Sequence, residues 1–114
     1  MNVVRAVPTE TISEKLSVQR LSDALGARQL RANVFTLAEG SMSRHMHREQ
    51  EEVYLVLDGK ALIDVDDEKL MVGEREALAV PARAWHRVTN VGVGPLTFYV
   101  VAAPAVEGDA EIAG

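Results

Sequence analysis

The sequence contains no cysteine, which excludes disulfide bonds and thiolate metal sites. Its 114 residues are too few for two ordinary domains, although they suffice for one hydrophobic core. No apolar run approaches the length needed to cross a bilayer, so we expect no transmembrane helix. The first twenty residues lack a basic start followed by an apolar stretch, so we expect no secretory signal. The absence of cysteine makes a cytoplasmic location the expectation.

The sequence also has little positive charge. Its 12 Lys and Arg residues stand against 17 Asp and Glu residues, which gives a formal net charge of -5 at pH 7. A nucleic-acid-binding protein normally shows a basic stripe, whereas the arginines here are scattered among acidic residues. We therefore expect this protein to bind neither nucleic acid nor an anionic membrane.

What the chain does contain is a succession of short strand patterns separated by turn residues. Residues 30–37 have a period of two, and residues 52–57 form a compact apolar strand. Asp58-Gly59 then predicts a hairpin to a partner strand over 61–65. Further strands are predicted at 69–72, 77–80, 86–90 and 96–102. This pattern is typical of an all-β sandwich or barrel.

The chain divides into three stretches of one domain. Residues 1–29 are predicted to form an N-terminal arm with the first strand or strands of the barrel, and a helix is the rival interpretation for 13–25. Residues 30–102 contain the strand-rich core. Residues 103–114 are small and acidic, and we expect them to form a flexible tail.

The three histidines of the sequence fall into one pattern together with an acidic residue. His45 and His47 are two residues apart, and side chains at i and i+2 of a strand point to the same face. Glu52 can add a carboxylate oxygen from the start of the next strand, and a barrel can bring His86 opposite. Three imidazole nitrogens and one carboxylate oxygen suit one divalent Fe, Mn, Co, Ni or Zn ion per chain.

These residues resemble the two conserved motifs of the cupin superfamily. The matching positions are Gly40, His45, His47, Glu52 and Gly59 in the first motif, and Pro81, His86 and Asn90 in the second. The resemblance covers residues 30–102 and implies a double-stranded β-helix, the cupin jelly-roll barrel, with the metal inside it. Glu51 competes with Glu52 for the carboxylate position, but the six-residue gap to Gly59 and strand alternation favour Glu52.

The chain departs from the cupin pattern in two turns. The family often has Gly-Asp shortly before the proline and Gly two residues after it, whereas this chain has Arg75-Glu76 and Arg83. A non-glycine residue in a left-handed turn costs about 1 kcal/mol. We therefore expect these two turns to be built differently.

The resemblance does not fix a reaction, because cupins include oxygenases, isomerases, decarboxylases and binding modules. The favoured hypothesis is a dioxygenase-like, metal-dependent oxidoreductase acting on a small organic molecule. The alternatives are a non-catalytic ligand-binding or sensor module and a sugar-phosphate isomerase or epimerase, and no catalytic residue is assigned. Four arginines near the motifs are candidates for contacting an anionic substrate: Arg44, Arg48, Arg83 and Arg87.

A homodimer is expected as well. The resemblance implies one, since small cupins commonly pair. The apolar residues on both faces of 53–57 cannot all point into one barrel, so another element must cover the outward-facing ones. The N-terminal arm or a second chain could do so, and we predict a second chain.

Overall fold

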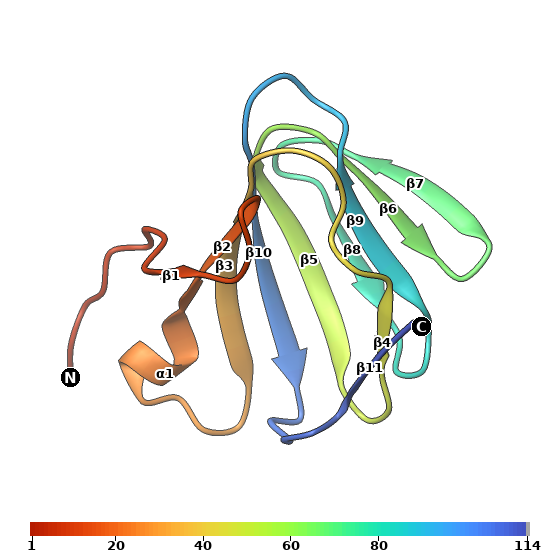
Figure 1. Ribbon diagram of the computed structural model, residues 1–114. Helices are drawn as coiled ribbons and strands as arrows, with labels where there is room; N and C mark the ends of the chain where they lie inside the picture. Colours follow the sequence, from red (N-terminus) through yellow and green to blue (C-terminus); the bar gives the residue numbers. More distant parts are fainter. Residues whose placement is uncertain (114) are drawn as a thin grey trace.

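The computed structural model, which describes residues 1–113, consists of two antiparallel β-sheets around a common core (Figure 1). The six-stranded sheet has the order β1-β2-β3-β10-β5-β8, and the five-stranded sheet has the order β11-β4-β9-β6-β7. The elements are β1 (Glu10–Thr11), β2 (Leu16–Arg20), α1 (Leu21–Leu25), β3 (Arg31–Leu37), β4 (His45–His47), β5 (Glu51–Asp58), β6 (Ala61–Val65), β7 (Glu68–Val72), β8 (Ala77–Val80), β9 (His86–Asn90), β10 (Leu96–Ala103) and β11 (Ala110–Ile112). The predicted all-β jelly-roll fold is confirmed. No helix in residues 1–113 is long and apolar enough to span a membrane.

Strand alternation explains where the core lies. In β10 every second side chain from Leu96 is buried, and in β5 the same alternation buries Tyr54 and Val56 while Val53 stays exposed. Phe98 pairs with Val56 on one side in the ladder and with Phe35 on the other. These inward side chains bury apolar surface between the two sheets, which is the main driving force for folding.

The predicted hairpin at Asp58-Gly59 is wrong, because the two strands that it joins belong to different sheets. Strand β5 is paired on both edges, by β10 and β8, so β6 pairs with β7 and β9 instead. Gly59 makes the corner with φ +95°, and a Cβ there would lie 3.0 Å from the Pro95 carbonyl oxygen. Only glycine fits such a turn without strain.

The expectation of differently built turns at Arg75 and Arg83 is also wrong. Both arginines adopt the left-handed conformation, with φ 64° and 70°. Backbone hydrogen bonds offset the strain: the Arg75 N–H donates to the Val56 carbonyl at 2.8 Å, and the Arg83 N–H donates to the His47 carbonyl at 2.6 Å. The second bond ties the turn before β9 to the strand that carries two histidines.

Strands lie near both ends of the chain. Residues 16–20 form strand β2 and residues 21–25 form helix α1, so each rival interpretation holds for part of that segment. The flexible tail expected from 103 onward contains strand β11, which pairs with β4. Asp109, only 7% exposed, anchors this strand because it accepts backbone hydrogen bonds from Glu49 and Gln50.

We expect the protein to form a homodimer through the outer face of β5, where Val53 and Leu57 are 47% and 46% exposed. Light scattering at micromolar concentration should give twice the chain mass, and Val53→Glu should shift the protein toward the monomer. Val93→Glu is the matched control, because Val93 is fully exposed on a loop outside this face. A wild-type protein of monomer mass would overturn the expectation.

Candidate metal centre

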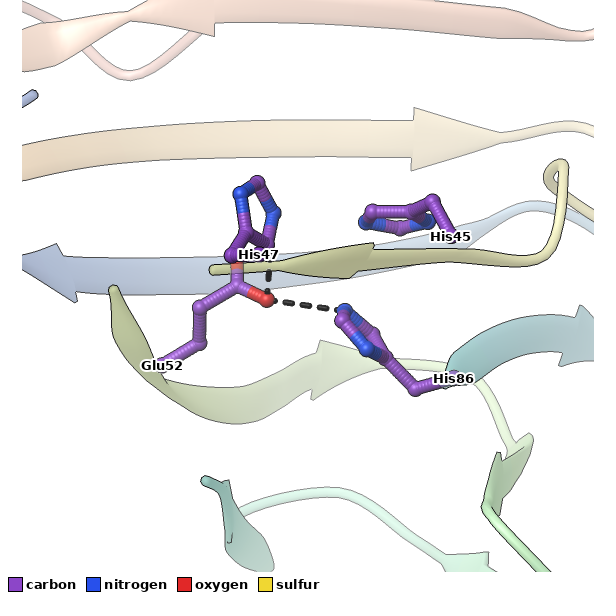
Figure 2. A group of neighbouring side chains, drawn as sticks. All are labelled: His45, His47, Glu52 and His86. Carbon is purple, nitrogen blue, oxygen red and sulfur yellow. Dashed lines mark ion pairs between the residues drawn. The ribbon is translucent and has the colours of Figure 1, made fainter. Parts of the chain in front are cut away.

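Four side chains from three strands converge inside the barrel (Figure 2). His45 and His47 extend from the same face of β4, His86 begins β9 directly opposite His45, and Glu52 comes from β5 in the other sheet. One donor atom from each residue lies within 4.8 Å of the other three. The structure therefore brings together all four residues that the sequence predicted. Glu52 is buried in this cluster, whereas Glu51 is exposed.

The Glu52 carboxylate lies at the centre of the contacts. Its Oε1 is 2.8 Å from His86 Nε2 and 3.6 Å from His47 Nε2 (Figure 2). The Tyr54 hydroxyl donates a hydrogen bond to the same oxygen at 3.2 Å. His86 Nε2 nevertheless has no hydrogen bond of good geometry and is fully buried. A buried polar atom without a partner costs about 1–3 kcal/mol.

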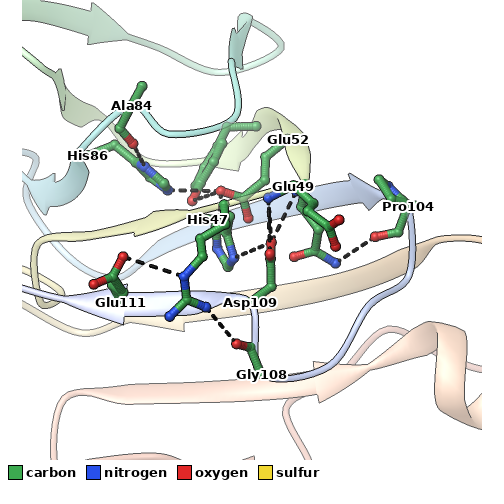
Figure 3. Close-up of polar contacts among 12 residues, drawn as sticks. His47, Glu49, Glu52, Ala84, His86, Pro104, Gly108, Asp109 and Glu111 are labelled. Atoms are coloured by element: carbon green, nitrogen blue, oxygen red, sulfur yellow. Dashed lines mark hydrogen bonds and ion pairs between the residues drawn. The ribbon is translucent and has the colours of Figure 1, made fainter.

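Backbone carbonyls orient two of the imidazoles. His45 Nδ1 lies 3.0 Å from the Ser43 oxygen, and His86 Nδ1 lies 2.9 Å from the Ala84 oxygen (Figure 3). A carbonyl can only accept, so Nδ1 is the donor in each contact, and Nε2 is the ring nitrogen that faces the cluster. Metal-binding histidines in proteins are commonly held in this way.

A carboxylate from the C-terminal segment lies behind the third imidazole. His47 Nδ1 is buried and makes no hydrogen bond, and the Asp109 Oδ2 atom is 3.8 Å away (Figure 3). The Asp109 carboxylate also accepts hydrogen bonds of 3.0 Å from the backbone N–H groups of Glu49 and Gln50. Asp109 was not predicted from the sequence as a site residue. The short run with strand character after it was the one sequence feature that indicated an ordered segment.

The electrostatics of the cluster favour the protonation states that bind metals. Burial lowers the pKa of His45 below its ordinary value, so this ring is neutral at pH 7. Burial raises the pKa of Glu52, but the adjacent imidazoles lower it by more, and the net shift is downward. Burial and the Glu52 charge raise the pKa of Tyr54 well above its ordinary value, so its hydroxyl remains a donor.

These observations agree with the donor chemistry of a divalent transition metal. Three imidazole nitrogens and one carboxylate oxygen form a mixed set suited to Fe, Mn, Co, Ni or Zn. A cation at the centre of the cluster would also give the buried His86 Nε2 a partner. The residues present therefore fit such an ion.

The metal-free protein should lose stability as the pH falls below about 6.5, because His45 is protonated near 6.5 when unfolded but only at lower pH when folded. At pH values between the pKa of His45 in the folded protein and its pKa in the unfolded chain, the unfolded state binds more protons. The free energy of unfolding therefore decreases as the pH falls through this range. Glu52, lowered from 4.5, adds a second loss below that pH. Urea midpoints at pH 7.5 and 5.5 test this, and His45→Gln should lose less than wild type. Equal losses in both proteins would disprove the role of His45.

A cavity of about 280 Å³ adjoins the cluster. Apolar side chains, among them Phe35, Met42 and Val100, form part of its wall, and Arg20, Arg31 and Asn33 add polar groups. None of the four arginines near the motifs lines it. Sequence reasoning missed Arg20 and Arg31 because they lie before the first motif and reach the cavity only through strand pairing.

Comparisons with known proteins agree with this architecture. The family model described as "Cupin domain" matches residues 33–102. An uncharacterized protein of Methanocaldococcus jannaschii is 28% identical over 79 residues, which are 69% of this chain but only 63% of that protein. The chain thus matches less than two thirds of this relative's length.

Two solved structures show the same fold. The first is a sugar phosphate isomerase from a cupin superfamily, from Silicibacter pomeroyi. It is 30% identical to this chain with a TM-score of 0.74, and the alignment covers 81% of this chain and 61% of that one. The polyketide cyclase RemF of Streptomyces resistomycificus is 23% identical with a TM-score of 0.81, covering 100% of this chain and 86% of that one.

Proposed function

Because the chain belongs to the cupin family, we propose that it binds one divalent transition-metal ion through His45, His47, Glu52 and His86. The observation that carries the proposal is the convergence of these four side chains, with a buried His86 Nε2 that lacks a hydrogen bond. Elemental analysis of protein purified without added metal tests it. We expect close to one Fe, Mn, Co, Ni or Zn ion per chain, and a metal-free protein that cannot be loaded would refute the site.

A bound ion of this kind would supply a Lewis acid with open positions for substrate or oxygen. The chain's own residues hold the ligand side chains in place and limit the access of water. Tyr54 holds the Glu52 carboxylate through its hydroxyl, and the carbonyls behind His45 and His86 hold their rings. The apolar part of the cavity wall, which includes Phe35, limits the access of bulk water.

The first candidate reaction is that of a dioxygenase-like oxidoreductase acting on a small organic molecule. Four protein ligands on an octahedral ion leave two positions, enough for oxygen and a substrate atom. Oxygen uptake by the iron-loaded protein over catechols, diketones, flavonoids and thiols tests this candidate. No uptake, together with zinc as the native metal, would count against it and in favour of a binding module or an isomerase.

A sugar-phosphate isomerase is the second candidate, and two observations favour it. The Silicibacter pomeroyi structure that is 30% identical bears that name, although this chain spans only 61% of it. Two arginine side chains also line the cavity, where a phosphate could bind. Solvent deuterium incorporation at C2 of an aldose phosphate, followed by NMR without oxygen, separates this reaction from the first.

Asp109→Asn should weaken metal binding by about 10- to 100-fold, the usual effect of losing a carboxylate behind a histidine ligand. Asp109 is the carboxylate beside His47 Nδ1. Zinc affinity is measured by competition with a chromogenic chelator. Glu111→Gln is the control, since Glu111 lies on the adjoining strand but is exposed. Unchanged affinity in Asp109→Asn would rule out this supporting role.

A further inference from the structure

The cavity beside the metal cluster has positive charge on the wall formed by β2 and β3. Arg20 is the last residue of β2, and Arg31 is the first residue of β3. Both side chains line the same cavity as His45, His47 and Glu52. The cavity thus places two permanently charged arginine side chains beside the candidate cation site.

Strand register gives the spacing between these two features. Arg31 pairs with Ala102 of β10, and Ala102 pairs with Glu52 of β5. Two strand spacings, about 10 Å, therefore separate the backbones of Arg31 and Glu52 along one row of the sheet. The residue between them is alanine, whose short side chain leaves the intervening space open. A short molecule can reach from one side to the other.

The Arg31 guanidinium makes weaker contacts with acidic side chains than the Arg20 guanidinium does. Glu10 accepts hydrogen bonds from Nε and Nη2 of Arg20 at 3.0 and 3.2 Å. The contact of Arg31 with Asp23 is 3.9 Å, too long for a hydrogen bond, and the Asp23 side chain is 62% exposed. Arg31 therefore keeps donors for an anionic group, with the Asn33 side chain next to it on the same face of β3.

We propose that the cavity binds a small organic acid with two ends, one at the metal cluster and a carboxylate or phosphate at Arg31. Asn33 and Arg20 complete the anion subsite. The inference rests on the proposed metal function and adds the chemical class of its ligand. A neutral ligand filling the same space would desolvate the Arg31 guanidinium without giving it a partner, which is unfavourable. The cavity volume of about 280 Å³ limits the ligand to a small molecule.

Three probes with the same α-hydroxycarboxylate head test the subsite by isothermal titration of the zinc-loaded protein. Malate carries a second carboxylate, 3-phosphoglycerate carries a phosphate, and lactate carries only a methyl group. We expect at least one of the first two to bind about 10-fold or more tighter than lactate, the effect of a charged hydrogen bond. The tighter of the two identifies the anion as carboxylate or phosphate.

Arg31→Gln should remove this preference while leaving zinc content and lactate binding unchanged. Arg28→Gln is the matched control, since Arg28 is exposed outside the cavity. A wild-type protein with a full zinc complement that binds all three probes equally, or none of them, overturns the anion subsite alone. Failure to bind zinc overturns the proposed metal function and the inference together.

Discussion

Replacing His47 with alanine is expected to lower zinc affinity by more than about 100-fold, beyond the loss caused by removing a residue behind a ligand. The variant removes one of three imidazoles and leaves the Glu52 carboxylate and the His86 ring without their neighbour. Competition with a chromogenic chelator gives the affinity, and elemental analysis gives the metal content of the purified variant. Glu52→Gln should have a comparable effect.

Glu51→Gln is the control that makes this result specific. Glu51 adjoins Glu52 in sequence and competes with it in the motif, but its side chain is exposed on the opposite face of β5. Its substitution should leave zinc affinity unchanged. Full metal content in His47→Ala, or loss of metal in Glu51→Gln, would show that the ligand set is assigned incorrectly.

Phe98→Ala is expected to lower the free energy of unfolding by about 3–5 kcal/mol. Phe98 is 1% exposed and stacks on Phe35 and Tyr54, with ring centroids 5.4 and 6.0 Å apart. Its removal leaves a cavity between the sheets that neighbouring side chains cannot fill. Urea denaturation of the metal-free protein measures the loss separately from any effect of the ion.

Tyr99→Ala provides the comparison for Phe98→Ala. Tyr99 is the next residue of β10, points to the other face of the sheet and is only half-buried. Its substitution should cost clearly less than that of Phe98. Equal losses for the two variants would mean that the inner face of β10 does not form the main core.

The grouping of His45, His47 and Glu52 could be predicted because its information is local in the sequence, whereas His86 was added through its match to the second cupin motif. The spacing of His45 and His47 fixes a shared face on one strand, and the alternation around Glu52 selects it over Glu51. The cavity arginines could not be found in this way. Arg31 reaches the site through the register of three strands, and that register is set by tertiary pairing.

Local signals also failed where neighbouring elements decide the outcome. Asp58-Gly59 has the composition of a hairpin turn, but β5 already has partners on both edges. Arg83 lacks the glycine that a left-handed turn favours, yet its backbone N–H bonds to His47 and holds the turn in place. In each case the competing interaction comes from a distant part of the chain.

The position of β11 has a practical consequence for how the protein is prepared. Ile112 pairs with His45, and the Ala113 N–H donates to the Arg44 carbonyl at 2.9 Å. A polyhistidine purification tag fused beyond β11 would therefore begin beside a candidate ligand and would compete with it for an added metal ion. Figure 1 places the N-terminus on the opposite side of the molecule. An affinity tag attached there would keep its imidazoles away from the candidate metal centre.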